Sequence, residues 1–233
     1  VDEADLLEYL GEDEQTKVIA MYIEGLRDGR RFIDVARRVG MKKPLLAIKS
    51  GRLGQGMKAT LSHTGAMAGS DRVYDGAFRQ TGIIRAEDIE DLFDMAKALC
   101  TQPIPTGDRV LVITNSGGPG VMMVDALEEL DLDVPETPAE MKEKLDFLPK
   151  ICSRSNPIDL TAQGGSEEYK KVLQIAQASP SFDVLIALWV PPAYIRSEAV
   201  SKAIVEARRV ASKPIVACFM SGDLVREAVE ILE

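Results

Sequence analysis

Two segments of the chain repeat one order of apolar and polar positions. The first has apolar runs at residues 17–23 and 44–49 with a helical pattern between them, and the second has runs at 184–190 and 214–219 around a similar pattern. Near-continuous apolar runs of this length are typical of strands in a parallel sheet whose two faces are covered by helices. Each segment therefore predicts a strand–helix–strand unit.

Both helical patterns carry an apolar stripe at the i, i+3, i+4, i+7 spacing, which indicates a helix face packed on the sheet. The stripe consists of Phe32, Val35, Ala36 and Val39 in the first segment and of Val200, Ala203, Ile204 and Ala207 in the second. The repeat predicts two similar α/β domains, at 1–100 and 108–233, with a linker at 101–107 that contains prolines and a glycine. The alternative is a chance resemblance, because this unit is common in α/β proteins.

The two copies differ in what surrounds them. A predicted strand at 109–114, a turn at 115–120 and a helix at 121–130 precede the second copy, and nothing equivalent precedes the first. The first copy instead continues through an apolar pair at 83–84 and a helix at 89–99. We therefore expect two three-layer α/β/α domains with parallel sheets, the first without its opening strand, turn and helix, and the second without its closing strand.

Composition narrows the class of protein. The chain has 233 residues, 45% of them hydrophobic and 28% charged, and a formal net charge of −9. This length allows two domains that each bury a core. The acidic balance without a basic run argues against a nucleic-acid partner, and no apolar stretch approaches the roughly 20 residues of a membrane-spanning helix. No signal peptide is visible, and the start at Val1 rather than Met leads us to expect a fragment of a longer protein.

The three cysteines, Cys100, Cys152 and Cys218, lie far apart and match no metal-ligand spacing. Each follows or lies within an apolar run. We therefore expect buried, reduced thiols of a cytoplasmic protein and no metal site.

The single histidine of the chain is the first candidate for chemistry. His63 lies between Gly56 and Gly69 in a stretch of small, hydroxylated and flexible residues. A histidine in such a setting can be presented to two partners in turn. The alternative is a solvated surface histidine with no role in chemistry.

The turn at 115–120 is the second candidate. It joins a buried strand to a helix and contains Ser116, Gly117, Gly118 and Gly120. A helix start of this kind offers free N–H groups and the positive end of the helix dipole to an anion, typically phosphate. The turn matches neither a Walker A loop nor the dinucleotide-binding fingerprint. The alternative is a tight strand–helix turn that binds nothing.

The third candidate is Glu24, at the carboxyl end of the run 17–23. Open α/β sheets place their ligands at this edge. A carboxylate here could accept a hydrogen bond from one imidazole nitrogen and leave the other nitrogen as nucleophile. The alternatives are a cap on the next helix or an ion pair with Arg27, Arg30 or Arg31.

Taken together, these residues carry a resemblance to a known family. Glu24, the segment Ser62–Ala66, the turn Ser116–Gly120 and the segment Ser155–Leu160 follow one another in this order. This combination resembles the nucleoside-diphosphate-forming acyl-CoA synthetases, which include the ADP-forming acetyl-CoA synthetases and are relatives of succinyl-CoA synthetase. The resemblance covers essentially all of the chain and corresponds to the two flavodoxin-like CoA-ligase domains of that family.

The resemblance implies specific roles. His63 matches the histidine that is transiently phosphorylated, and Glu24 matches the glutamate that orients it. Ser116, Gly117, Gly118 and Gly120 match the start of a helix that holds the phosphohistidine. The family further implies CoA, ADP or ATP and Mg²⁺ in the complete enzyme, a CoA-binding Rossmann domain and an ATP-grasp domain or subunit as partners, and an oligomer. We expect none of these ligands to bind this chain by itself, and we expect phosphate as its only ligand.

Two other functions stay open from the sequence alone. One is a non-catalytic, acyl-CoA-sensing module fused to a protein acetyltransferase, although the presence of both His63 and Glu24 argues against a module that has lost catalysis. The other is a flavodoxin-like FMN-binding protein. The turn Ser116–Gly120 is short for a flavin phosphate loop, and the chain has one Trp and five Tyr, which argues against this second function.

Overall fold

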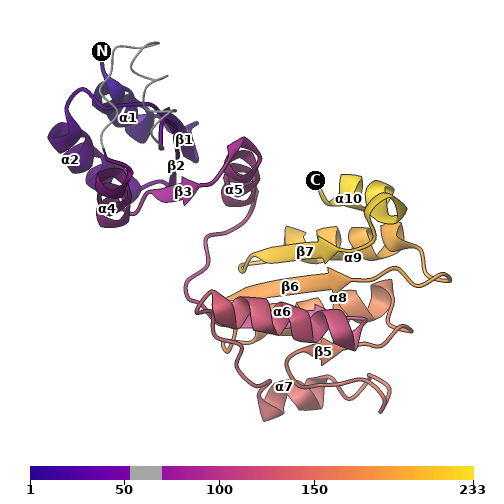
Figure 1. The fold of residues 1–233 in the computed structure, drawn as a ribbon. Helices are drawn as coiled ribbons and strands as arrows, with labels where there is room; N and C mark the ends of the chain where they lie inside the picture. Colours follow the sequence, from indigo (N-terminus) through magenta and orange to yellow (C-terminus); the bar gives the residue numbers. More distant parts are fainter. Residues whose placement is uncertain (53–69) are drawn as a thin grey trace. The chain divides into compact units, whose positions relative to one another are not determined.

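The computed structural model of the chain describes residues 1–52 and 70–233 (Figure 1). His63 and the glycine-rich stretch around it lie outside the described residues. The chain divides into two compact units, Val1–Thr101 and Gln102–Glu233, so the boundary falls at the start of the predicted linker.

The first unit is built on a parallel three-stranded sheet with the strand order β1-β2-β3. Its elements are α1 (Glu3–Glu12), β1 (Ile19–Ile23), α2 (Gly29–Gly40), β2 (Leu45–Lys49), α4 (Asp71–Thr81), β3 (Ile84–Ala86) and α5 (Ile89–Thr101). The predicted strands at 17–23 and 44–49 are thus present as β1 and β2.

Helices cover both faces of this sheet. On one face, Leu45 and Ala47 of β2 pack with the buried side chains of α1, α2 and α4. On the other face, Leu46 packs with Leu92 and further residues of α5. The stripe predicted for α2 is confirmed, because Phe32, Val35, Ala36 and Val39 are all buried in the first of these clusters.

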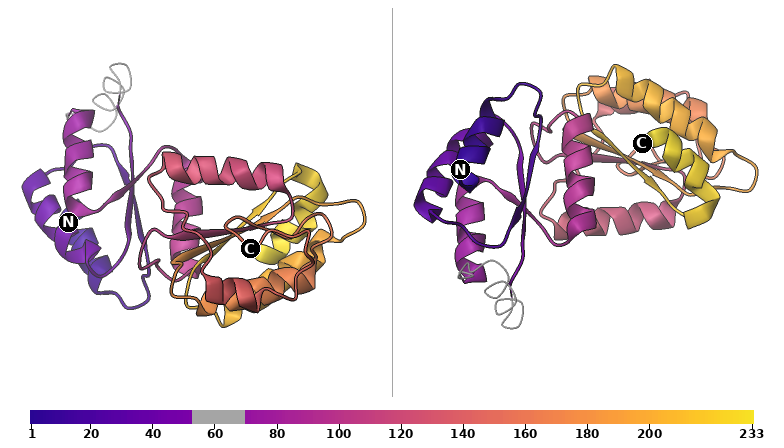
Figure 2. Two further views of the ribbon diagram at one scale, coloured as in Figure 1. Left: turned by 90° about the horizontal axis from the view of Figure 1, so that it is seen from below. Right: turned by 90° about the horizontal axis from the view of Figure 1, so that it is seen from above.

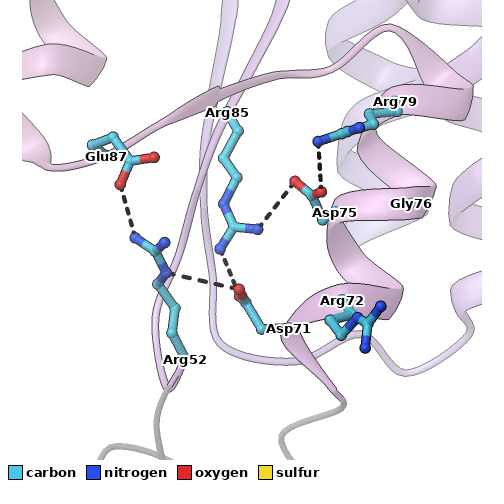
Figure 3. A pocket seen from close by; sticks show the side chains of 8 residues that line it. All are labelled: Arg52, Asp71, Arg72, Asp75, Gly76, Arg79, Arg85 and Glu87. Carbon is cyan, nitrogen blue, oxygen red and sulfur yellow. Dashed lines mark hydrogen bonds and ion pairs between the residues drawn. The ribbon is translucent and has the colours of Figure 1, made fainter.

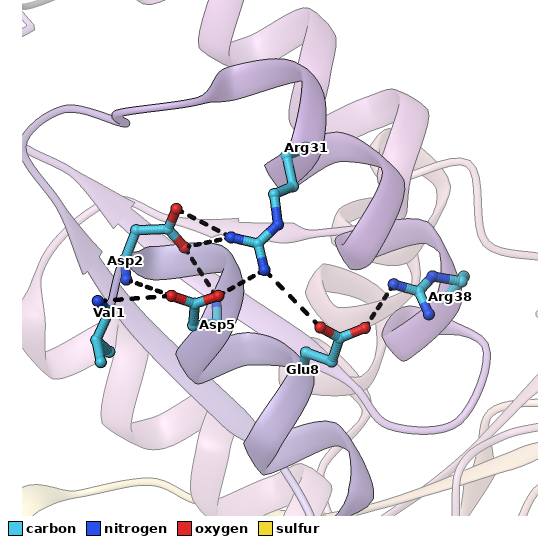
Figure 4. Close-up of polar contacts among 6 residues, drawn as sticks. All are labelled: Val1, Asp2, Asp5, Glu8, Arg31 and Arg38. Carbon is cyan, nitrogen blue, oxygen red and sulfur yellow. Dashed lines mark hydrogen bonds and ion pairs between the residues drawn. The ribbon is translucent and has the colours of Figure 1, made fainter.

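Ion pairs connect α1 to α2 at the surface of the first unit (Figure 4). Asp2 caps α1 by accepting a hydrogen bond from the backbone N–H of Asp5. The guanidinium of Arg31 on α2 bonds both oxygens of Asp2 at 3.1 Å and also reaches Asp5. Because these side chains are partly exposed, we assign this cluster to the docking of the two helices and expect a modest contribution to stability.

The second unit has a parallel four-stranded sheet with the strand order β5-β4-β6-β7. Its elements are β4 (Val110–Thr114), α6 (Gly117–Glu129), α7 (Ala139–Lys144), β5 (Ile158–Asp159), α8 (Ser166–Ala178), β6 (Val184–Trp189), α9 (Ser197–Arg209), β7 (Ile215–Phe219), a 3-10 turn (Gly222–Val225) and α10 (Arg226–Leu232). Figure 2 shows α6 on one face of this sheet and α8 and α9 on the other.

The side chains of β4 show how this sheet is buried on both faces. Leu111 and Ile113 lie in the larger cluster together with residues of α8 and α9. Val110 and Val112 lie in the smaller cluster with Leu127 of α6. The stripe predicted for α9 is also confirmed as buried. The expected three-layer α/β/α architecture with parallel sheets is therefore confirmed.

The order α1, β1, α2, β2 in the first unit corresponds to α8, β6, α9, β7 in the second. Both pairs of strands are adjacent and parallel, with Ile19 opposite Leu45 and Leu185 opposite Ile215. A lysine before the last strand of each set bonds carbonyl oxygens at the end of the first helix. Lys43 donates to the carbonyls of Leu10 and Asp13, and Lys213 donates to those of Ala176 and Ser179. This shared detail supports a duplication rather than a chance resemblance.

Two expectations from the sequence are wrong. The helix expected at 121–130 begins at Gly117, because Pro119 fits the first helical turn, where no N–H is needed. Cys100 is exposed rather than buried, while Cys152 and Cys218 are half-buried. Cys100 lies near the end of α5, whose packing on the sheet is made by Leu92, Met95, Ala96 and Leu99.

Within residues 1–52 and 70–233, no helix combines the length and the apolar character that crossing a membrane requires.

One ion pair joins the starts of β4 and β6. The carboxylate of Asp183 accepts hydrogen bonds from Nε and Nη2 of Arg109 at 2.7 and 2.9 Å and from the backbone N–H of the same residue. Asp183 itself is buried. The hydrogen bonds from Arg109 lower the pKa of Asp183 from 3.8 to about 2.

This pair predicts a pH dependence of stability. A carboxyl group whose pKa is depressed in the folded state stabilises the fold above its unfolded pKa and loses this contribution as the pH falls toward the folded value. We expect Asp183→Asn to lower the urea midpoint of unfolding at about pH 6, and the difference from the parent chain to shrink as the pH falls from about 4 to 2. A difference that stays constant over this range would contradict the role of Asp183.

Candidate functional site

The carboxyl ends of β1 and β2 form the edge at which the sequence places chemistry in the first unit. Glu24 follows β1, and Ser50 follows β2. The N–H of Ser50 donates to the carbonyl of Ile23 at 3.1 Å, so the ladder between the strands continues to this edge. The chain then leads from Arg52 into the residues that include His63. Parallel pairing therefore brings Glu24 and the chain that approaches His63 to one side of the sheet.

Glu24 has a carboxylate oxygen that is buried and unsatisfied. Its Oε2 atom has no hydrogen-bond partner among the residues that the structure describes. The alternatives from the sequence do not hold there: Asp28 caps α2, and Arg31 pairs with acidic residues of α1. A buried acceptor without a donor is unfavourable. This oxygen is therefore available to an incoming donor.

Lys49 lies below the same edge and is almost completely buried, with 2% of its surface exposed. Its Nζ atom donates to the carbonyl of Glu24 at 3.0 Å and to the carbonyl of Ser50. The ammonium group also lies 4.7 Å from the ring centre of Tyr74 on α4. Burial lowers the pKa of Lys49, while the negative charges of Asp71 and Glu24 act in the opposite direction.

A cavity of about 460 Å³ lies beside this edge (Figure 3). Arg52 pairs with Glu87 at 3.0 Å and reaches Asp71 at 3.9 Å, while Arg85 pairs with Asp71 at 2.5 Å. Asp71 thus links Arg52, which precedes residues 53–69, to Arg85 on β3, which follows them. These ion pairs hold the two flanking parts of the chain together. The residues that line the cavity are Arg52, Asp71, Arg72, Asp75, Gly76, Arg79, Arg85 and Glu87.

The second candidate site is the start of α6 in the second unit. Ser116 is the N-cap residue, but its side chain makes no capping hydrogen bond. Its own N–H donates to Oγ1 of Thr114, and the N–H of Gly120 donates to the carbonyl of Ser116. Within the described chain, the N–H groups of Gly117 and Gly118 are the ones left at this helix start without such a bond. Of the four predicted phosphate-binding residues, these two offer backbone donors.

Close packing explains two of these glycines. A Cβ atom on Gly120 would lie 2.9 Å from the side chain of Thr114, so the helix can approach β4 only without one. A Cβ atom on Gly117 would lie 3.1 Å from Oδ2 of Asp159. Gly118 has open space at this position. The carboxylate of Asp159 therefore lies beside the helix start, where a bound anion would meet its negative charge.

Asn115 holds the turn before α6 against β6. Its side chain donates to the carbonyl of Val190 at 2.7 Å and accepts from the N–H of Val190 at 2.9 Å. This pair fixes the ends of two adjacent strands.

Sequence reasoning did not identify Lys49, Asp159 or the pairing of Arg52 with Asp71. A signal for Lys49 was present, since this charged residue ends an apolar run and corresponds to Phe219 when the two copies are aligned. The ion pairs around Asp71 carried no such signal, because charged residues on a helix are usually solvated. No cluster of three or more acidic, histidine or cysteine side chains that could hold a metal ion occurs in the described part of the chain.

Two family models identify the domains of this chain. The model of a succinyl-CoA ligase like flavodoxin domain matches residues 1–99, and the model of a ligase-CoA domain matches residues 110–233. Together they describe the two units as CoA-ligase domains with the flavodoxin-like fold.

Curated relatives and solved structures narrow the family. The chain is 40% identical to the alpha subunits of acetate–CoA ligases [ADP-forming] II and I of Pyrococcus furiosus, each time over its full length, and spans 52% and 51% of these relatives. A structure of the dinucleotide-forming acetyl-coenzyme A synthetase 1 of Ca. Korarchaeum cryptofilum in complex with phosphate and ADP superimposes with a TM-score of 0.92 at 39% identity, and the chain covers 51% of it. The chain belongs to the family of ADP-forming acyl-CoA synthetases and spans about half the length of the relatives it matches.

The packing at the start of α6 predicts opposite effects of two alanine substitutions. We expect Gly120→Ala to destabilise the chain by about 1–3 kcal/mol, because its methyl group would overlap the side chain of Thr114. We expect Gly118→Ala to change stability by less than about 1 kcal/mol, and in the stabilising direction, because space is open and alanine favours the helix. Urea unfolding of both variants measures the difference, and equal effects would refute this account of the turn.

Proposed function

We propose that the chain is the flavodoxin-like part of an ADP-forming acyl-CoA synthetase that interconverts acyl-CoA, ADP and phosphate with a carboxylate, CoA and ATP. Phosphate attacks the thioester to form an acyl phosphate and release CoA. An imidazole nitrogen of His63 then attacks the phosphorus atom, which releases the carboxylate. ADP takes the phosphoryl group from the histidine and becomes ATP. The family membership of both units supports this reaction class, with acetyl-CoA as the expected acyl donor.

The observation that carries the proposal is the unsatisfied carboxylate oxygen of Glu24. We propose that it accepts a hydrogen bond from one nitrogen of His63, which fixes the ring and leaves the other nitrogen as nucleophile. The negative charge of Glu24 also favours the positive charge that develops on the ring during the attack. His63 lies outside the described residues, so this contact rests on the chemistry of Glu24 and on the family resemblance.

The start of α6 supplies the second part of the proposed chemistry. The N–H groups of Gly117 and Gly118 belong to a helix start, whose partial positive charge favours an anion. We propose that they bind phosphate or the phosphoryl group of the phosphohistidine, together with the hydroxyl of Ser116. Phosphate is a ligand of the structural relative from Ca. Korarchaeum cryptofilum, which supports this assignment.

We propose that the remaining ligands of the complete enzyme bind other domains. No cluster of three or more acidic, histidine or cysteine side chains that could hold a metal ion occurs among the described residues. We propose that CoA binds a Rossmann domain and that ADP and Mg²⁺ bind an ATP-grasp domain or subunit, which are partners of this chain. The alpha-subunit designation of the Pyrococcus furiosus relatives and the ADP in the structural relative support partners of this kind.

The central prediction concerns phosphorylation of His63 in the complete enzyme. We expect His63→Asn to abolish acid-labile ³²P incorporation from labelled ATP, because asparagine has no nucleophilic ring nitrogen. We expect Glu24→Gln, which keeps an acceptor but loses the charge, to slow incorporation by about 10²-fold or more. Rapid-quench labelling measures both rates. Acyl phosphate formation, which precedes the attack by histidine, serves as the control that should persist in His63→Asn. Undiminished labelling of His63→Asn would refute the proposed function.

A second prediction tests the helix start in the 233-residue chain itself. Inorganic phosphate should shift the amide NMR signals of Gly117 and Gly118 more than those of other glycines. Asp159→Asn should tighten this binding, because it removes a negative charge beside Gly117. Glu167→Gln at the start of α8 is the matched control and should leave the titration unchanged. Shifts elsewhere but not at 117–118 would count against the site.

A further inference from the structure

The two copies differ at the last position of their last shared strand, which is buried in the first unit and half-buried in the second. In the first unit, Lys49 lies opposite Ile23, and in the second unit Phe219 lies opposite Trp189. Phe219 packs on the ring of Trp189, with ring centres 6.4 Å apart. An aromatic residue thus fills the place that a lysine takes in the unit that carries Glu24 and His63.

A lysine is an unfavourable choice for this place if packing alone decides. Burial of an ammonium group removes its hydration, and an apolar side chain of similar volume is often equally or more stabilising. Lys49 is 2% exposed, and burial lowers its pKa. In the second unit, the half-buried Phe219 shows that the end of this strand accepts an apolar residue. The lysine therefore has a role beyond filling the core.

The contacts of Lys49 indicate that role. Its ammonium group bonds the carbonyl of Glu24 after β1 and the carbonyl of Ser50 after β2, and it lies over the ring of Tyr74 on α4. These three segments are the ones that carry Glu24 and lead into and out of the residues around His63. In the second unit, the carbonyl that corresponds to that of Glu24 belongs to Val190 and is held by the neutral amide of Asn115. Among the described residues, a charged group thus bonds this carbonyl in the first unit, and a neutral amide bonds it in the second.

We propose that Lys49 is a positioning residue for the phosphohistidine chemistry. Its ammonium group fixes the backbone of Glu24 relative to the chain that leads to His63. This inference rests on the proposed function.

The test uses the complete enzyme and four substitutions. Lys49→Met removes the charge with little change in length, Lys49→Phe copies the second unit, and Lys49→Arg keeps the charge. Lys43→Met is the matched control, because Lys43 also bonds two carbonyls in the same unit but at the end of α1, away from Glu24. Thermal unfolding and the rate of ³²P incorporation into His63 are measured for each variant.

We expect Lys49→Met and Lys49→Phe to slow phosphorylation by at least about 10-fold, as the loss of an orienting partner typically does, in enzyme that remains folded under the assay conditions. Lys49→Arg should keep more of the rate than Lys49→Met. Lys43→Met should lower the midpoint and leave the rate unchanged. Because Lys49 acts through Glu24, Lys49→Met combined with Glu24→Gln should be no slower than Glu24→Gln alone.

Three results would overturn the inference. The first is an unchanged rate of phosphorylation in Lys49→Met or Lys49→Phe. The second is a rate in the double variant that falls by the product of the two single effects. The third is a fall in stability with loss of folded protein in both apolar variants, which would make Lys49 a structural residue. Failure of the proposed function gives a different outcome, since the parent enzyme itself would then not be labelled at His63.

Discussion

The arrangement of both units depends on one constraint, which is the satisfaction of backbone polar groups where parallel strands end. The strands are buried on both faces, so the carbonyls just beyond their last ladder bonds have little access to water. Side chains meet this need in each unit: Lys49 bonds the carbonyls of Glu24 and Ser50, and Asn115 bonds that of Val190. The choice of these side chains fixes the geometry of the turns on which the candidate chemistry lies.

The two units share the same arrangement of helices and strands but differ at the carboxyl ends of their strands. The two units keep the same helix–strand order and the same lysine at the end of the first helix, Lys43 in one and Lys213 in the other. They differ at the carboxyl edge, where the first unit has Glu24 held by the ammonium group of Lys49 and the second has the amide of Asn115 and the glycines of α6 beside Asp159. The features that both units share therefore support the fold, while the candidate site residues lie where the units differ.

The sequence predicted the fold well and the site in part. Apolar runs and stripes such as Phe32–Val39 identified strands and buried helix faces, because burial on a parallel sheet leaves a periodic pattern. The start of α6 was placed too late, since glycines resemble a turn even where Pro119 already begins the helix. Cys100 was expected to be buried because apolar residues precede it. It is exposed, because a run of apolar neighbours does not show which side of a helix a residue occupies. The partners of Lys49 depend on segments far apart in the chain, which no local pattern reveals.

The two edges leave different groups unsatisfied. The first unit leaves the acceptor Oε2 of Glu24 and the hydroxyl of Ser50, which can donate or accept, buried without partners among the described residues. The second leaves the N–H donors of Gly117 and Gly118 at a helix start. A phosphohistidine requires both kinds, because its ring N–H needs an acceptor and its phosphoryl oxygens need donors. Under the proposed function, Glu24 serves the ring and the N–H groups of Gly117 and Gly118 serve the phosphoryl group.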